Sequence, residues 1–264
     1  MSAIPAVEFE SVSLSFGSFV ALRDVSFLIP AGQFVAFVGP TGSGKTSVLN
    51  LAAGLMAPTG GMVRMSGKPV DSVNRNAAYM FQQDALLPWK TALDNIALGP
   101  LLRGVPRREA IEEAERWIHL AGLRGFEHRY PIQLSGGQRK RIAMAQALIN
   151  RLPLLLMDEP FSALDVQTRA LMENELLALW KDSGATVLFV THDLEEAIAL
   201  SDRVILFSAG PETRVKADYP VNLPRPRNVA EARFTPGFME IYSQLWADLK
   251  QEVMTSYERS RQKA

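Results

Sequence analysis

Short, almost wholly apolar runs alternate with helical patterns through much of the chain. Three of these runs cover residues 33–38, 154–157 and 186–190. Runs of this length are typical of strands that are buried on both faces of a parallel sheet. Apolar residues with helical spacing lie between these runs, and Gly54 and Gly184 can cap the C-termini of the helices. This alternation predicts an α/β fold with a parallel sheet.

A second sheet is predicted from the patterns at 7–16, 25–29 and 62–65. The first stretch alternates roughly between apolar and polar residues, and the last follows the Gly60-Gly61 turn. Alternation of this kind is typical of strands with one face in water. We therefore expect a small, mostly antiparallel β subdomain beside the strand at 33–38.

Helical patterns predominate from about residue 85 to 150. A helix that begins at Pro106 carries apolar residues at i, i+3, i+4 and i+7 and ends at Gly122. Another helix is expected at about 139–150. These residues predict a helical subdomain inserted in an α/β domain that covers residues 1–225.

A C-terminal helical extension is expected over residues 226–264, with its main helix from about Thr235. One face of that helix is apolar: Phe238, Ile241, Tyr242, Leu245, Trp246, Leu249 and Val253. Its polar face has no excess of basic residues, as a helix lying on a membrane would have. We expect it to pack against its own domain or a partner copy.

The composition narrows the classes of partner. Lys+Arg and Asp+Glu number 28 each, so bulk charge does not predict a nucleic-acid partner. Cysteine is absent, which excludes disulfides and thiolate metal sites. We see no signal peptide and no run near the ~18 apolar residues of a membrane-spanning helix. The chain is not expected to cross a membrane by itself.

Residues 39–46 match the phosphate-binding loop pattern G-x-x-x-x-G-K-[ST], between a predicted strand and a predicted helix. Glycines let consecutive backbone N–H groups point at phosphate oxygens, and the helix N-terminus adds its positive end. Lys45 would reach the phosphates of ATP, and the Thr46 hydroxyl would ligate Mg²⁺. The expected nucleotide-binding residues are Gly39, Pro40, Thr41, Gly42, Ser43, Gly44, Lys45, Thr46 and Ser47.

Two carboxylates follow the apolar run at 154–157. Asp158 stands at the end of that predicted strand, where it could hold Mg²⁺, and Glu159 could act as the general base for an attacking water. His192 follows the neighbouring strand. It is either a core histidine or a residue of the same crevice, because open α/β sheets bind ligands at the carboxyl ends of their strands.

In order and spacing, these segments resemble the motifs of ABC transporter ATP-binding subunits over about residues 7–210. The matching segments are 39–46, Gln82, Leu134-Ser135-Gly136-Gly137-Gln138, 154–159, Ser162-Ala163-Leu164-Asp165 and His192. One position departs from the family's usual pattern, because Gln146 stands where members often have an arginine. The resemblance implies a phosphate-loop ATPase of the ABC type, with ATP and Mg²⁺ as cofactors.

The resemblance also implies roles within a homodimer. Ser135, Gly136, Gly137 and Gln138 would contact the nucleotide held by the partner subunit, and Asp165 would lie at the dimer contact. Within one subunit, three residues take roles in hydrolysis. Gln82 would sense Mg²⁺ and the attacking water, His192 would contact the γ-phosphate, and Glu159 would be the base. Phe16 would stack on adenine, although it could also be an ordinary core aromatic.

A finer resemblance is to the ATPases of the nitrate, sulfonate and taurine importer group. It rests on Leu86-Leu87-Pro88-Trp89-Lys90, Asp94-Asn95-Ile96 and the stretch 223–227. It implies uptake of a small, anionic solute, with permease subunits, an extracytoplasmic solute-binding protein, and a peripheral location on the cytoplasmic face of the inner membrane. Residues 86–89 would belong to the docking groove for a permease helix. Alternatives are an importer of the pyrimidine-precursor or riboflavin type, an exporter, a soluble non-transport ABC ATPase, or a non-hydrolysing nucleotide-gated scaffold.

Overall fold

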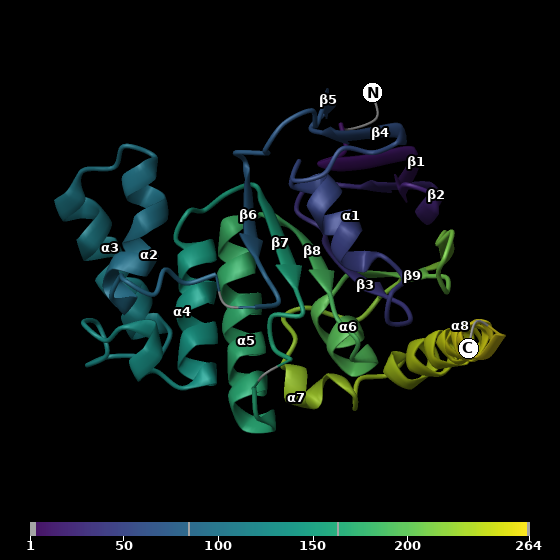
Figure 1. The fold of residues 1–264 in the computed structure, drawn as a ribbon. Coiled ribbons are helices and arrows are strands. Elements are labelled where there is room, and N and C mark those ends of the chain that lie inside the picture. Colours follow the sequence, from purple (N-terminus) through teal and green to yellow (C-terminus); the bar gives the residue numbers. More distant parts are fainter. Residues whose placement is uncertain (1–3, 84, 163, 263–264) are drawn as a thin grey trace.

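A computed structural model of the chain describes residues 4–83, 85–162 and 164–262 (Figure 1). Its central sheet has the strand order β10-β9-β3-β8-β7-β6. The pairs β3–β8, β3–β9, β7–β8 and β6–β7 are parallel, and β10 is antiparallel to β9. The strands are β3 Phe34–Val38, β6 Ala77–Met80, β7 Leu154–Asp158, β8 Thr186–Val190, β9 Arg203–Phe207 and β10 Val215–Pro220. The prediction of an α/β fold with a parallel sheet is confirmed.

Both faces of the central sheet are covered. Every residue of β3, β7 and β8 is buried. Alternate residues of β3 enter two separate hydrophobic clusters, with Phe34 in one and Phe37 in the other. The first cluster includes residues from α5 (Val166–Ser183) and α6 (Leu194–Leu200), and the second includes residues from α1 (Lys45–Ala52). This double burial explains why the strands read as continuous apolar runs.

The predicted antiparallel subdomain is present as a sheet of order β2-β1-β4-β5, above α1 in Figure 1. β2 begins well before the predicted strand at 25–29. Register shifts interrupt its pairing with β1, and Asp24 has φ +51°. These irregularities break the alternation that a sequence pattern detects. The bounds are β1 Val7–Phe16, β2 Phe19–Ile29, β4 Gly60–Met65 and β5 Lys68–Pro69.

The helical subdomain lies at the opposite end of the molecule from the antiparallel sheet (Figure 1). It includes α2 (Ala92–Leu102), α3 (Arg107–Leu120), a 3₁₀ turn η1 (Pro131–Gln133) and α4 (Gly136–Leu148). α3 begins directly after Pro106, as predicted. α2 was not predicted, because Gly99 and Pro100 lie inside it and weaken its helical pattern. α4 begins three residues before the predicted Arg139.

The C-terminal extension holds α7 (Val229–Ala232) and α8 (Phe238–Gln262). Phe238 and Leu245 are fully buried in the cluster that covers one face of the central sheet. Polar contacts add to this packing, because Glu252 accepts a hydrogen bond from the Ala209 N–H at 2.8 Å. α8 therefore packs against its own domain. Among the described residues, no helix combines the length and the apolar composition that a membrane span requires.

Arg227 joins the extension to the core. Its side chain is only 4% exposed. Nη1 donates to the carbonyl oxygens of Ile198, Ala199 and Ser201, and Nη2 donates to those of Val221 and Leu223. Carbonyls at a helix C-terminus have no partner within the helix. Arg227 therefore supplies donors to the end of α6, the helix that follows His192.

Replacing Arg227 with alanine should lower the free energy of unfolding by about 2–4 kcal/mol, because several buried carbonyl oxygens lose a charged donor. Urea denaturation followed by circular dichroism measures this loss. Arg124→Ala, at an exposed arginine, is the matched control and should change stability by no more than about 0.5 kcal/mol. Equal stability of the two variants would contradict the anchoring role of Arg227.

Candidate functional site

The phosphate-binding loop joins the end of β3 to the start of α1. Gly39 has φ +155° and Gly44 has φ +77°. A Cβ on Gly39 would lie 2.9 Å from the carbonyl oxygen of Phe207, and one on Gly44 would lie 2.8 Å from Cδ2 of Leu22. The loop therefore packs closely against β9 and β2. Gly39 needs glycine for conformation and because the backbone leaves no room for a Cβ, and Gly44 needs it for conformation.

Lys45 is held inside this loop. It is 8% exposed, and its Nζ donates to the carbonyl oxygens of Gly39 and Pro40, both at 2.9 Å, and to Ser43 Oγ at 3.3 Å. Burial lowers the pKa of Lys45, and the negative charges of Glu159 and Asp158 raise it, with a net lowering. The ammonium group is therefore held against the loop by its oxygen atoms.

Asp158 provides a partly satisfied buried carboxylate. It is 3% exposed, and its Oδ1 has no hydrogen-bond partner among the described residues. Burial raises the pKa of Asp158, while a hydrogen bond with Thr46 and the cationic charges of Lys45 and Lys140 lower it, with a net rise. A buried carboxylate oxygen without a donor is costly unless a cation or a water satisfies it.

This arrangement fits Mg²⁺. A carboxylate oxygen and a hydroxyl oxygen are the hard ligands that Mg²⁺ takes beside phosphate and water. Within the ranges that the structure describes, no group of three or more His, Cys, Asp or Glu residues could hold a metal ion. A site made by Asp158 and Thr46 would therefore depend on the phosphates of the nucleotide for further ligands.

Three predicted residues meet at one oxygen atom. The Gln82 amide Nε2 donates to Glu159 Oε2 at 3.1 Å, and His192 Nδ1 lies 3.4 Å from the same oxygen. They follow β6, β7 and β8, which are parallel neighbours, so their carboxyl ends share one edge of the sheet. The His192 side chain is 67% exposed, so the alternative of a core histidine is wrong.

The backbone of Glu159 is unusual. Its φ is +46°, in the left-handed region that residues other than glycine rarely adopt. Its N–H donates to the carbonyl oxygen of Val190 at 2.9 Å, which ties the residue to the end of β8. Such backbone strain persists where surrounding structure holds it, often at functional sites. The Glu159 side chain is 21% exposed and therefore remains accessible to a ligand.

The Ser-Gly-Gly-Gln segment forms the start of α4. Ser135 Oγ accepts from the Gln138 N–H at 3.2 Å, and Gln138 Oε1 accepts from the Ser135 N–H at 2.9 Å. This reciprocal capping explains why α4 begins at Gly136 rather than at Arg139. Gly136 and Gly137 stay partly exposed at the helix N-terminus, where backbone N–H groups favour anions.

Asp165 and Phe16 lie on the surface, away from the core. Asp165 caps α5 by accepting from the Thr168 N–H at 3.0 Å, and this hydrogen bond lowers the pKa of the carboxyl group. Phe16 is 49% exposed and pairs across the β1–β2 hairpin with Phe19, so the core-aromatic alternative is wrong. Ala163, part of the segment that resembles the family motif, lies outside the described residues.

Lys140 is a functional candidate that the sequence analysis missed. It is 5% exposed, and its Nζ donates to the carbonyl oxygens of Phe81, at 3.4 Å, and Gln82. In the sequence it belongs to the basic run Arg139-Lys140-Arg141, which is typical of a solvated helix surface. Helical periodicity was the available signal, because Lys140 lies at i, i+4 and i+7 spacing with Met144 and Ala147, which are also buried.

Comparison with known proteins identifies the family. The profile of the ABC transporter family matches residues 22–162. The chain belongs to this family. Within it, the chain is 46% identical to the taurine import ATP-binding protein TauB of Chromobacterium violaceum, over 87% of this chain and 89% of TauB. It is 41% identical to the aliphatic sulfonates import ATP-binding protein SsuB of Escherichia coli, over 92% of this chain and 89% of SsuB.

Solved ABC cassettes share the fold. A dimeric post-hydrolysis structure of the ATP-binding cassette MJ0796, bound to ADP and Pi, superimposes with a TM-score of 0.73 and 31% identity. The match covers 82% of this chain and 99% of that one. The chain is therefore an ABC-type ATPase that binds ATP, and the predicted class of enzyme is confirmed.

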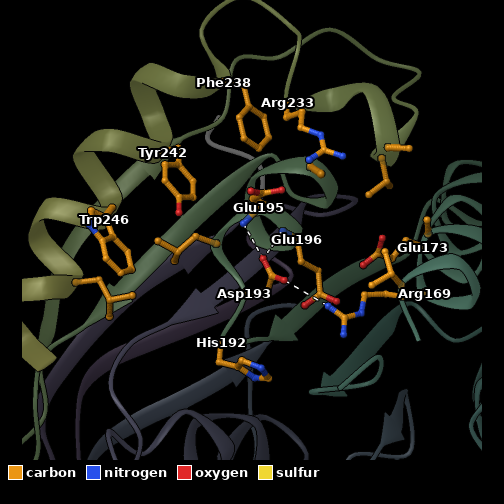
Figure 2. Close-up of a pocket in the computed structure, with 17 residues that line it drawn as sticks. Arg169, Glu173, His192, Asp193, Glu195, Glu196, Arg233, Phe238, Tyr242 and Trp246 are labelled. Atoms are coloured by element: carbon orange, nitrogen blue, oxygen red, sulfur yellow. Dashed lines mark hydrogen bonds and ion pairs between the residues drawn. The ribbon is translucent and has the colours of Figure 1, made fainter. Parts of the chain in front are cut away.

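A cavity of this ABC ATPase adjoins His192. It has a volume of about 570 Å³ and lies between α5, α6, α7 and α8, with Phe238, Tyr242 and Trp246 along one side (Figure 2). Glu173 and Glu196 are buried in its opposite wall and share a hydrogen bond. Burial is the main cause that raises the pKa of both carboxyl groups.

The buried Glu196 makes stability depend on pH. Its folded-state pKa lies above the ordinary value of 4.5, so the folded chain binds the proton more tightly than the unfolded chain. This contribution to stability is complete below about pH 4.5 and is lost as the pH rises through the folded-state pKa. Besides burial, the pKa of Glu196 is influenced directly by Thr191, Glu173 and Asp193. Arg169 influences it through its effect on Glu173.

We expect Glu196→Gln to raise the melting temperature at pH 8 by roughly 3–6 °C, because the amide removes a buried charge without changing the shape. The gain should shrink as the pH falls towards 5. Differential scanning calorimetry between pH 5 and 8 measures both effects. Glu195→Gln, at the exposed neighbouring position, is the control and should show no such trend. A pH-independent difference would contradict the raised pKa of Glu196.

Proposed function

We propose that this ABC ATPase powers the uptake of a small, anionic solute of the sulfonate, taurine or nitrate kind. The observation that carries hydrolysis is the convergence of Gln82 and His192 on the Glu159 carboxylate beside the Lys45 loop. The direction of transport and the solute class are supported by identities of 41–46% to proteins named as importers of sulfonates and taurine.

In the proposed mechanism, Glu159 accepts the proton of the attacking water as general base. The Gln82 amide donates to its Oε2, and His192 Nδ1 lies 3.4 Å from the same oxygen. Gln82 would also contact the attacking water, and His192 would contact the γ-phosphate. Lys45 and the loop N–H groups bind the phosphates. Asp158, Thr46 and Gln82 would hold Mg²⁺, which neutralises charge on the phosphates when it is bound.

We infer that two copies complete each site. Residues 135–138 would bind the γ-phosphate of an ATP held by the partner subunit, since the exposed N-terminus of α4 favours an anion. Asp165 would lie at the contact between the copies, and the exposed ring of Phe16 would stack on adenine. The dimeric cassette of known structure supports this arrangement.

A groove suits the permease contact. A cavity of about 950 Å³ lies along the β6 edge of the central sheet, and its lining includes Phe81, Ala85, Leu102 and Gln146. Leu102 is 79% exposed, and Phe81 directly precedes Gln82. A permease helix seated here would therefore touch the residue next to the catalytic glutamine.

Residues 86–89 stay a proposed part of the permease contact, although the described lining of this groove does not include them. Leu86 is buried in the hydrophobic cluster of the helical subdomain, whereas Trp89 is 70% exposed. Asn95 sets this arrangement, because it is fully buried and joins Leu87, Lys90 and Thr91 through side-chain hydrogen bonds. These bonds fold the segment back onto α2.

The proposed transporter has three further parts. Two permease subunits would cross the inner membrane, an extracytoplasmic binding protein would deliver the solute, and the ATPase would lie on the cytoplasmic face. The solute itself is selected by the permease and the binding protein. No residue of the ATPase is proposed to touch it.

Glu159→Gln should lower the rate of ATP hydrolysis at least about 100-fold, because the amide cannot accept the proton. ATP affinity should stay within about 3-fold, since the Lys45 loop is unchanged. Phosphate release, nucleotide titration and size-exclusion chromatography with ATP measure turnover, affinity and a trapped dimer. Glu109→Gln, at an exposed position of α3, is the control. Undiminished turnover would remove Glu159 from the role of base.

The importer proposal is tested by purifying the tagged ATPase from native membranes in mild detergent. A multi-span membrane protein should co-purify, and should be lost with Leu102→Glu, which places a charge in the groove. Leu28→Glu, at a half-exposed leucine of β2, should retain it. The companion binding protein should then bind taurine, an alkanesulfonate or nitrate. Recovery of ribosomal proteins or DNA without a membrane partner would contradict the proposal.

A further inference from the structure

Lys140 links two segments that carry different parts of the site. It lies on α4, five residues after Ser135, and its ammonium group donates to the carbonyl oxygens of Phe81 and Gln82. The side chain is buried, with 5% of the residue exposed. A buried ammonium group is costly unless acceptors satisfy it, so these contacts constrain both partners.

The segment that Lys140 contacts has left the sheet. The pairing of β6 with β7 ends at Met80, so the carbonyl oxygens of Phe81 and Gln82 are not part of that ladder. Further along the chain, Leu87 is held by Asn95 of α2. The ammonium group of Lys140 attaches the backbone of Gln82 to α4.

Gln82 therefore contacts two different elements of the fold. Its backbone carbonyl accepts from Lys140 on α4, and its side-chain amide donates to Glu159 Oε2. The position of the Gln82 amide relative to Glu159 Oε2 depends on the position of the Gln82 backbone. Any displacement of α4 relative to β6 would move the amide with respect to the carboxylate.

We propose that Lys140 is a positioning residue for ATP hydrolysis. It holds the Gln82 backbone so that the Gln82 amide orients Glu159, and it links the N-terminus of α4 to the carboxylate. Since a helix rises 1.5 Å per residue, Ser135 and Lys140 are about 7.5 Å apart along α4 and move together. The inference rests on the proposed roles of Gln82 and Glu159.

A purely structural role predicts something different. Lys140 would then only attach the helical subdomain to the core, and its loss would affect folding and activity whether or not Gln82 is present. A double-mutant cycle between positions 140 and 82 separates these roles, because residues that act through one another do not give independent effects.

The cycle uses Lys140→Met, Gln82→Ala, the double variant, and Lys181→Met as the control at an exposed lysine. We expect Lys140→Met to lower kcat about 10-fold or more, while the Kd for ATP measured without Mg²⁺ stays within about 2-fold. The double variant should turn over at the rate of Gln82→Ala alone. Lys140→Arg, which keeps a charged donor, should restore most of the rate, and Lys181→Met should match the parent.

The proposal would be overturned if the fold-losses in kcat of the two single variants multiply in the double variant. Full activity of Lys140→Met would also overturn it, as would a loss of ATP affinity in Lys140→Met as large as its loss in kcat. If Lys140→Met gives no soluble protein, Lys140→Ala replaces it in the same cycle with the same criteria. Full turnover of Gln82→Ala would instead overturn the role of Gln82 in the proposed function. A slow Gln82→Ala with multiplicative effects would overturn the role of Lys140 alone.

Discussion

The burial of β3, β7 and β8 on both faces is the constraint on which the site depends. Strands with no polar face must lie inside a sheet that helices cover on both sides, and in this fold they run parallel. Their carboxyl ends then meet at one edge. The phosphate-binding loop, the Asp158-Glu159 pair and His192 lie at those three ends, so a crevice lined by functional groups results from the way the core packs.

The charged groups in this crevice are held in place by contacts with their own chain. Lys45 is held by loop carbonyl oxygens, and the hydrogen bond between Thr46 and Asp158 orients that carboxylate. Preorganised groups of this kind need little rearrangement during a reaction, which is the main way that proteins stabilise charge in a transition state. The cost appears elsewhere, in the buried Oδ1 of Asp158 and the strained backbone of Glu159.

The carboxylate of Glu159 also lies between two groups of elements with different proposed roles in the transporter. Gln82 connects it to α4 and to the groove along β6, while His192 connects it to α6 and the cavity next to α8. Arg227 in turn holds the end of α6 to the C-terminal extension. Binding events at the groove, at the N-terminus of α4 or at the extension would therefore reach the same oxygen atom through short chains of contacts.

The amino-acid sequence determined most of the site by itself. The phosphate-binding loop, the Asp158-Glu159 pair and the Ser135–Gln138 segment are continuous, and their local geometry follows from glycine, capping residues and buried strand ends. The central sheet could also be predicted, because strands buried on both faces leave a strong apolar signal. These are features whose physical cause lies within a few consecutive residues.

Only the tertiary structure decided the features that depend on distant partners. A lysine in a basic run looks solvated until the fold brings the carbonyl oxygens of Phe81 and Gln82 to it. α2 tolerates Gly99 and Pro100 because packing within the helical subdomain outweighs helix propensity. Leu86 and Trp89 lie three residues apart, yet one is buried and the other is 70% exposed, because Asn95 folds the segment between them.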